Sequence, residues 1–236
     1  MTTALVDGDI VAYRTAASCE KQGVLVESQE VALLRADELM RRILQETESD
    51  TYKVFLTGSD NYRYQYNPEY KANRKDVPRP AHLQAVREYL VTEWNATVED
   101  GQEADDAMGI YQMANHDTII CSIDKDLLMI PGEHYDFVKS IRRDVYNIPA
   151  MRHFYWQLIM GDRTDNVFGF DGIARQKVPQ KLQHVMDELE SYDDELDMFN
   201  FVRGLYNNDE QLLANGICLW IRRNEGEIWA PPTKLD

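Results

Sequence analysis

Short apolar segments alternate with amphipathic segments along the first part of the chain, and this alternation limits the folds that the chain can adopt. The apolar segments have the length of strands, and the amphipathic ones carry apolar residues at three- and four-residue spacing. Strands that alternate with helices predict an α/β fold, with a mostly parallel sheet and helices on both faces. The predicted strands cover residues 3–6, 52–57, 96–99 and 117–123, and the predicted helices between them cover 30–48, 83–94 and 103–114.

The character of the sequence changes after about Ile148. The segment MRHFYWQLIMGDR, a glycine-containing loop and the segment RQKVPQKLQHVMDEL are typical of two helices joined by a turn, and more helix is expected through 209–223. We therefore predict an α/β domain over residues 1–148 and a helical part over 149–236 that packs on it.

Composition excludes several classes of protein. A length of 236 residues with 44% hydrophobic residues supports one large domain, or one domain with a smaller appendage. We expect a cytoplasmic protein with no membrane association, because the sequence has no apolar run of membrane-spanning length and no basic leader. Three cysteines without CxxC spacing indicate reduced thiols and no zinc ribbon: Cys19, Cys121 and Cys218.

The formal net charge of −16 argues against nucleic acid as a partner, unless the acids are gathered in a metal site and the bases cluster locally. The positions of the acids favour this exception. Eight carboxylates come from four segments, three of which follow predicted strands, where ligands of open α/β sheets bind. They are Asp7, then Glu103, Asp105 and Asp106, then Asp124 and Asp126, and finally Asp162 and Asp165.

Each acidic segment also has a local explanation. Asp7 can cap a helix, EADD suits a first helical turn, and the other two segments can be solvated loops or turns. Four such segments, three of them at one predicted sheet edge, are less easily explained in this way, because crowded carboxylates repel each other. Mg²⁺ or Mn²⁺ removes that penalty, and two such ions can activate water and hold a phosphodiester. The histidines are scattered and are expected to be structural: His82, His116, His134, His153 and His184.

Two segments carry features that suit DNA. In residues 60–75, Arg63, Lys71, Arg74 and Lys75 lie among four tyrosines, which suits phosphate contacts and base stacking, although the tyrosines can equally form a packed face. In residues 169–174, two glycines precede Arg175, Lys177 and Lys181, so backbone amides and basic side chains can meet a phosphate backbone. A plain glycine turn between two helices explains the second segment as well.

Five motifs in order resemble the 5′-nuclease superfamily of flap endonucleases and 5′→3′ exonucleases. They are VDGD (6–9), PEYKANR (68–74), EADD (103–106), SIDKDL (122–127) and GDRTDNVFGFDGIA (161–174). The stretches GSDNYR and LWIRRNEGEIW look most like the exonucleases of short-tailed bacteriophages, which implies a place in the host cytoplasm.

The resemblance implies a sheet domain with a gateway over the active site, here short and at about residues 60–90, and a helix–three-turn–helix for duplex DNA. It implies 5′→3′ exonuclease activity on DNA 5′ ends, with flap cleavage and RNA-primer removal from RNA:DNA hybrids as variants. Protein partners are not indicated.

The same resemblance assigns roles to residues. Asp7, Glu103 and Asp105, with Asp106 beside them, would bind a first metal ion. Asp124, Asp126 and Asp165 would bind a second, and Asp162 lies in the same loop as Asp165. Lys71 and Arg74 would contact the reacting phosphate and Tyr70 would stack. The remaining DNA contacts would come from Arg14, Arg63, Gly169, Gly172, Arg175 and Lys177, with K⁺ at the glycine turn.

The sequence departs from the family pattern after the strand at 52–57, where an aspartate is usual. Gly58 or Thr57 takes that position, and Asp60 is the nearest acid. Phe168 and Ala174 replace a usual proline and glycine in the turn, which weakens the potassium assignment. A catalytically impaired flap-binding protein is therefore an alternative. A phosphatase built on Asp7-Gly8-Asp9 is a third hypothesis, but the usual following threonine is missing.

Overall fold

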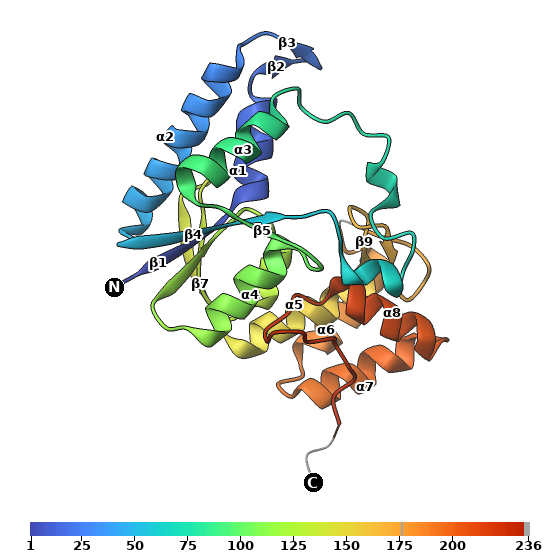
Figure 1. The fold of residues 1–236 in the computed structure, drawn as a ribbon. Helices are drawn as coiled ribbons and strands as arrows, with labels where there is room; N and C mark the ends of the chain where they lie inside the picture. Colours follow the sequence, from blue (N-terminus) through green and yellow to red (C-terminus); the bar gives the residue numbers. More distant parts are fainter. Residues whose placement is uncertain (176, 234–236) are drawn as a thin grey trace.

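A six-stranded sheet forms the centre of the computed structural model, which describes residues 1–175 and 177–233 (Figure 1). The strand order is β5-β4-β1-β6-β7-β8, and neighbouring strands are parallel except for the last pair. The predicted α/β fold with a mostly parallel sheet is therefore confirmed. The strands are β1 (Thr3–Asp7), β4 (Thr51–Thr57), β5 (Thr97–Glu99), β6 (Thr118–Cys121), β7 (Gly132–Asp136) and β8 (Ile141–Val145).

Both faces of the sheet are covered, because its central strands are apolar on both sides. In β1, Leu5 joins one hydrophobic cluster, while Ala4 and Val6 join the other. This is the burial pattern of a parallel sheet between two helical layers. One face packs against α1 (Gly8–Ala17), α2 (Gln29–Thr47) and α3 (Leu83–Trp94), and the other against α4 (Ala104–Ala114) and α5 (Asn147–Met160).

The helices of the C-terminal part pack around α5, below the sheet in the view of Figure 1. Their side chains belong to the same hydrophobic cluster as Leu5 and Ile120 of the sheet. The change in sequence character near residue 148 thus coincides with the start of α5, while the division into two domains stays a prediction. The helices are α6 (Gln183–Glu190), α7 (Glu195–Leu205) and α8 (Asp209–Leu219).

The helix predicted to follow the glycine turn directly was placed too early. Residues 173–175 and 177–179 are not helical, and the next helical residues are the 3-10 turn η4 (Gln180–Leu182) and then α6. Pro179 explains the late start, since the residue before a proline is disfavoured in a helix and proline itself suits a helix beginning. The turn is preceded by two short paired strands, β9 (Gly161–Asp162) and β10 (Val167–Phe168).

The segment predicted as a gateway is mostly irregular. It holds two 3-10 turns, η1 (Tyr62–Gln65) and η2 (Ala72–Arg74), and α3 begins only at Leu83. Two further features were not predicted: the antiparallel edge formed by β7 and β8, and a hairpin of β2 (Glu20–Lys21) and β3 (Val24–Leu25). Among the described residues, no helix is long and apolar enough to cross a membrane.

Candidate active site

The parallel strands β4, β1 and β6 are neighbours, so their carboxyl ends meet at one edge of the sheet. Asp7 is the last residue of β1, and Ser122 and Asp124 follow β6. Helix α4 begins at the same edge with Glu103 as its N-cap residue. The sheet thus places acids from separate parts of the sequence side by side.

Asp7 is 3% exposed and holds two elements together. Its Oδ1 accepts a hydrogen bond from the backbone N–H of Ile10 at 3.0 Å, which caps α1, and its Oδ2 accepts one from Ser122 Oγ at 2.6 Å. Burial, followed by the negative charges of Asp9 and Asp124, raises the pKa of Asp7 to about 7. Asp7 is therefore an acid whose ionised form needs a nearby positive charge.

Asp105 and Asp126 experience the same repulsion. Burial raises the pKa of Asp105 well above its ordinary value, and the charges of Asp7, Asp124 and Glu103 raise it further. Burial and the charge of Asp124 raise the pKa of Asp126 to about 7. Acids from β1, from α4 and from the loop after β6 are thus close enough to perturb one another.

Basic and phenolic side chains from the gateway segment neutralise the other part of the site. Lys71 Nζ donates to Glu103 Oε1 at 2.5 Å, and Arg74 Nη2 donates to Asp165 Oδ1 at 2.7 Å. The Tyr70 hydroxyl donates to Asp165 Oδ2 at 2.8 Å and lies 3.1 Å from Glu103 Oε2. Burial opposes ionisation of Glu103, but Lys71 and then Arg63 outweigh it and lower the pKa of Glu103 to about 2.

The loop after α5 contributes Asp162, which is tied to the loop after β6 by a lysine. Lys125 Nζ donates to Asp126 Oδ1 at 2.6 Å and to Asp162 Oδ2 at 2.7 Å. Gln157 Nε2, from α5, donates to the same Asp126 oxygen at 2.5 Å. The four acidic segments of the sequence therefore join one network.

Asp106 and Arg63 are corrections to the predicted site. Asp106 is fully buried, and its two oxygens accept from the two terminal nitrogens of Arg63 at 2.6 and 2.8 Å. Arg63 is 2% exposed and also donates to the backbone oxygens of Cys218 and Trp220. Asp106 is therefore committed to an ion pair instead of a metal ion, and Arg63 cannot reach DNA.

Tyr70 is a third correction, because its ring is 2% exposed and does not offer a face to a base. Gly169 is also buried, and its N–H donates within the turn, to Ile173 O, at 3.3 Å. An added Cβ at Gly169 would lie 2.3 Å from Ile159 O, so glycine is required there for close packing. The N–H of Gly169 is thus not available to a phosphate.

The other expected DNA contacts are on the surface. Arg14 on α1, Gly172 and Lys177 are exposed. Gly172 has a φ of +73°, which the turn requires. Arg175 is partly buried and forms an ion pair with Asp171. Contacts of these residues with DNA stay predictions.

Close packing at the end of β4 explains why residue 58 is a glycine and not the aspartate that is usual in the family. A Cβ at Gly58 would lie 2.4 Å from both Glu99 O and Asp100 Oδ1, so a side chain does not fit there. Thr57 Oγ1 accepts from the N–H of Ala104 and supports the start of α4. Asp60 is exposed, and its Oδ1 accepts from the next backbone N–H at 2.8 Å.

Several contributors to the site were not predicted. Ser122 and Lys125 lie inside the SIDKDL motif, so the motif itself was the available signal. Asp9 lies in the VDGD motif and forms an ion pair with Arg87 of α3. Arg87 and Gln157 had no local signal, because only the fold brings them to acids that are distant in the sequence.

The donor chemistry fits a hard divalent cation, since the side chains are carboxylates whose burial, followed by their mutual repulsion, raises the pKa values of Asp7, Asp105 and Asp126. The geometry is more open than a closed metal cage. Within residues 1–175 and 177–233, no group of three or more His, Cys, Asp or Glu side chains is already arranged around one metal position. Metal binding by Asp7, Asp105, Asp124 and Asp126 stays a prediction. The same holds for Glu103, Asp162 and Asp165, which pair with Lys71, Lys125 and Arg74 in this structure.

Comparisons with known proteins identify relatives of this chain. DNA polymerase I of Caldicellulosiruptor bescii is 31% identical over 152 residues, which are 55% of this chain and 18% of that protein. This chain thus spans less than a fifth of the length of that relative.

Two solved structures have the same fold, each at 18% identity and each covering 93% of this chain and 89% of the other. They are a phage T5 protein co-crystallised with metal ions, with a TM-score of 0.68, and a phage T5 flap endonuclease in a pseudo-enzyme-product complex with DNA and metal ions, with a TM-score of 0.67. The family model described as the 5′-3′ exonuclease, N-terminal resolvase-like domain matches residues 2–155, the larger part of the chain, and the chain therefore belongs to this family.

Proposed function

We propose that this protein hydrolyses phosphodiester bonds at DNA 5′ ends as a 5′→3′ exonuclease, using two Mg²⁺ or Mn²⁺ ions, with cleavage of 5′ flaps as a variant of the same reaction. The observation that carries the proposal is the meeting of acids from β1, α4 and the loop after β6, with Lys71 and Arg74 beside them. When bound, two divalent cations would supply the charge that activates a water molecule and stabilises the leaving oxygen.

The protein's own residues would orient the substrate and balance its charge. The backbone of Lys71 has a φ of 55°, and its N–H donates to Asp165 O at 2.9 Å. This hydrogen bond fixes the position of Lys71 beside the acids. Arg74 is exposed. Its guanidinium can donate to a phosphate oxygen while its Nη2 stays bonded to Asp165. Asp7, locked by Ser122 and Ile10, gives the ligand set a fixed edge.

A 5′-labelled duplex tests the activity. In Mg²⁺ the protein should release mononucleotides or short oligonucleotides, and EDTA should stop the release. The double variant Asp124→Ala, Asp126→Ala should lose at least 100-fold in rate, on the order expected when metal ligands are removed. Asp144→Ala on β8 is the matched control, because Asp144 is exposed at the far edge of the sheet. Full activity in the double variant would falsify the two-metal proposal.

Asp60 allows a separate test of the first metal ion. If Asp60 replaces the carboxylate that Gly58 cannot carry, Asp60→Ala should raise the Mg²⁺ concentration needed for half-maximal cleavage. If Asp60 is not a ligand, the Mg²⁺ dependence should stay the same. The exposure of Asp60 and its bond to the adjacent backbone N–H favour the second outcome.

The absence of a side chain at Gly58 favours one alternative, a 5′-flap-binding protein with impaired catalysis. This alternative predicts tight binding to a 5′ flap without turnover at any Mg²⁺ or Mn²⁺ concentration. Gel-shift and cleavage assays on the same labelled flap distinguish the two functions.

The substrate range is a finer part of the proposal. The relative named DNA polymerase I motivates activity on 5′ ends made during replication, including RNA primers paired with DNA. Cleavage of matched duplexes with a DNA or an RNA 5′ segment measures this preference. Replacing K⁺ by Na⁺ in the same assay tests the K⁺ site proposed at the turn of Gly169 and Gly172.

A further inference from the structure

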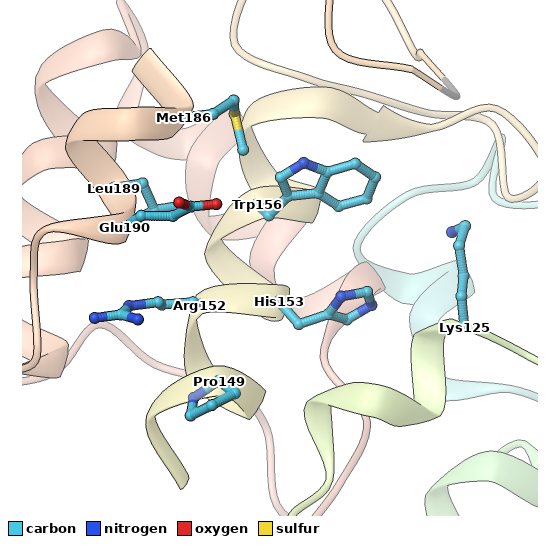
Figure 2. Close-up of a pocket in the computed structure, with 8 residues that line it drawn as sticks. All are labelled: Lys125, Pro149, Arg152, His153, Trp156, Met186, Leu189 and Glu190. Atoms are coloured by element: carbon cyan, nitrogen blue, oxygen red, sulfur yellow. The ribbon is translucent and has the colours of Figure 1, made fainter. Parts of the chain in front are cut away.

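A cavity of about 360 Å³ lies between α5 and α6, beside the acidic network (Figure 2). Helix α5 lines it with Pro149, Arg152, His153 and Trp156, at the spacing of one helix face. Its volume falls within the range of about 300–1,000 Å³ typical of small-ligand pockets. The other lining residues are Lys125 and, from α6, Met186, Leu189 and Glu190.

The aromatic rings of His153 and Trp156 give this cavity a flat surface. Their centroids are 5.8 Å apart and their planes differ by 18°, and Figure 2 shows the two rings side by side on α5. Burial lowers the pKa of His153 to about 4, so its ring is neutral at pH 7. Aromatic surfaces of this kind stack on unpaired bases with little dependence on sequence.

A polar nitrogen in the same wall lacks a partner. His153 Nε2 is buried and forms no hydrogen bond with the part of the chain that the structure describes. Buried polar atoms are normally satisfied, so this nitrogen suits a ligand that can donate or accept. A nucleobase edge can do both.

The charge of the cavity lining is opposite to that of the whole protein. The protein has 41 acids and 25 lysines and arginines, whereas the cavity has Lys125 and Arg152 against a single acid, Glu190. Arg152 is held in place because Nε and Nη2 donate to Tyr192 O at 3.0 and 2.9 Å, and Nη2 also donates to Asp193 Oδ1 at 2.6 Å. Lys125 and Arg152 are each paired with acids just outside the lining, so they offer N–H donors to a phosphate oxygen and no net positive charge.

Lys125 connects the cavity to the candidate active site, because its Nζ contacts Asp126 and Asp162 while the residue also lines the cavity. A DNA strand with one phosphate in the candidate active site can thus place an adjacent unpaired nucleotide over Trp156. We propose that this cavity binds an unpaired nucleotide, with the base on the Trp156–His153 surface and its phosphate toward Lys125. The DNA-borne form of this proposal rests on the proposed nuclease function.

Tryptophan fluorescence tests the pocket without any cleavage. Trp94, Trp220 and Trp229 are 4–7% exposed, whereas Trp156 is only partly buried, so a ligand in the pocket should quench Trp156 selectively. In EDTA, dAMP should give saturable quenching in the wild type and in the control Trp94→Phe, and none in Trp156→Phe. Equal quenching in Trp156→Phe, or no quenching of the wild type by either dAMP or a single-nucleotide gapped duplex, would overturn the proposal.

A cleavage assay identifies the source of the nucleotide. On a 5′-labelled duplex with one unpaired nucleotide beside the cleavage site, Trp156→Ala should lower kcat/KM about tenfold, from the loss of one base stack. Trp156→Phe should keep most of the rate, and both variants should cleave a nicked duplex as the wild type does. Equal loss on both duplexes excludes a DNA-borne nucleotide, and dAMP quenching would then assign the pocket to the free mononucleotide. If the wild type cleaves neither duplex, the nuclease proposal fails, while the fluorescence result still decides the pocket.

Discussion

Arg63 and Asp106 form an ion pair that is closed off from solvent at the base of the candidate active site. The guanidinium donates to both carboxylate oxygens and to two backbone oxygens near the C-terminal end of α8, so it joins α4 to that part of the chain. Asp106 Oδ1 also accepts from the N–H of Arg222 at 3.0 Å. These bonds give the pair a structural role.

Arg63→Met should therefore destabilise the fold, because it leaves the Asp106 carboxylate buried without its partner. Breaking such a pair costs about 3–5 kcal/mol, which a urea unfolding curve measures directly. Arg14→Met, at an exposed position of α1, is the control and should leave the free energy of unfolding within about 0.5 kcal/mol. Unchanged stability together with weaker DNA binding would restore Arg63 as a DNA contact.

His134 on β7 gives a prediction on pH. It is 5% exposed, its Nε2 lies 2.8 Å from Ile130 O, and burial lowers its pKa from 6.5 to about 4. Between these two values the unfolded chain binds more protons than the folded one, so stability is lost as the pH falls from 6.5 to 4. At about 1.4 kcal/mol per pKa unit, the loss due to His134 is about 3 kcal/mol.

Urea unfolding at pH 7 and pH 5 measures this effect. His134→Gln should reduce the difference in stability between the two pH values, whereas His116→Gln should not, because His116 is exposed. A pH dependence that is identical in wild type and His134→Gln would contradict the assignment.

At the scale of elements, the contact between the ends of β4 and β5 determines what residue 58 can be. Gly58 N donates to Glu99 O at 2.7 Å, and no space remains for a Cβ. Gly58→Asp should therefore lower the free energy of unfolding by about 1–3 kcal/mol, the usual cost of overpacking, without increasing metal affinity. Ser59→Asp, at the exposed next position, is the control. Tighter Mn²⁺ binding by Gly58→Asp with unchanged stability would contradict this prediction. It would mean that the end of β5 can move to make room for the side chain.

The elements that were predicted correctly are those with strong local patterns. β1, β4 and β6 are apolar and short, and α2 has regular apolar spacing, so their ends could be located within one or two residues. The positions of Asp7 and Asp124 followed from those ends. By contrast, β7 and β8 include many polar residues, and their pairing across the sheet edge has no local signal.

The individual roles within EADD could not be predicted for a related reason. All four residues suit the start of a helix, but the direction in which each carboxylate points depends on the helix packing. In the structure the negative charges of the other acids raise the pKa of Asp105, while Asp106 is paired with Arg63, which comes from a distant segment. A sequence pattern identifies the cluster, whereas tertiary contacts separate the site acid from the structural one.

At the scale of the whole molecule, the net charge of −16 makes DNA binding local. Exposed acids repel the phosphate backbone over most of the surface, while Arg14, Arg74 and Lys177 are exposed and basic. DNA affinity should therefore fall only gently with added salt. A plot of the logarithm of the association constant against the logarithm of the salt concentration should have a slope of about −0.9 for each phosphate contact. Fluorescence anisotropy with a labelled duplex in EDTA, from 50 to 200 mM salt, measures the slope. A slope steeper than about −6 would indicate a much larger basic surface.

The same acids couple metal binding to the stability of the entire fold. Asp7, Asp105 and Asp124 come from β1, from α4 and from the loop after β6, so they form one site only while the sheet and α4 are assembled. A cation that binds the folded protein alone should stabilise it, by about 2.7 kcal/mol at a concentration of 100 times Kd. For a chain of this length, that corresponds to a rise in Tm of roughly 5–10 °C.

Thermal unfolding in EDTA and in Mn²⁺ at equal ionic strength measures this rise. The double variant Asp124→Ala, Asp126→Ala should lose most of the rise, and Asp144→Ala should retain it. Because mutual repulsion among the acids is also relieved in the double variant, its Tm in EDTA should not fall below that of the wild type by more than a few degrees. An equal Mn²⁺ effect in all three proteins would place the bound cation elsewhere and separate the acidic cluster from metal binding.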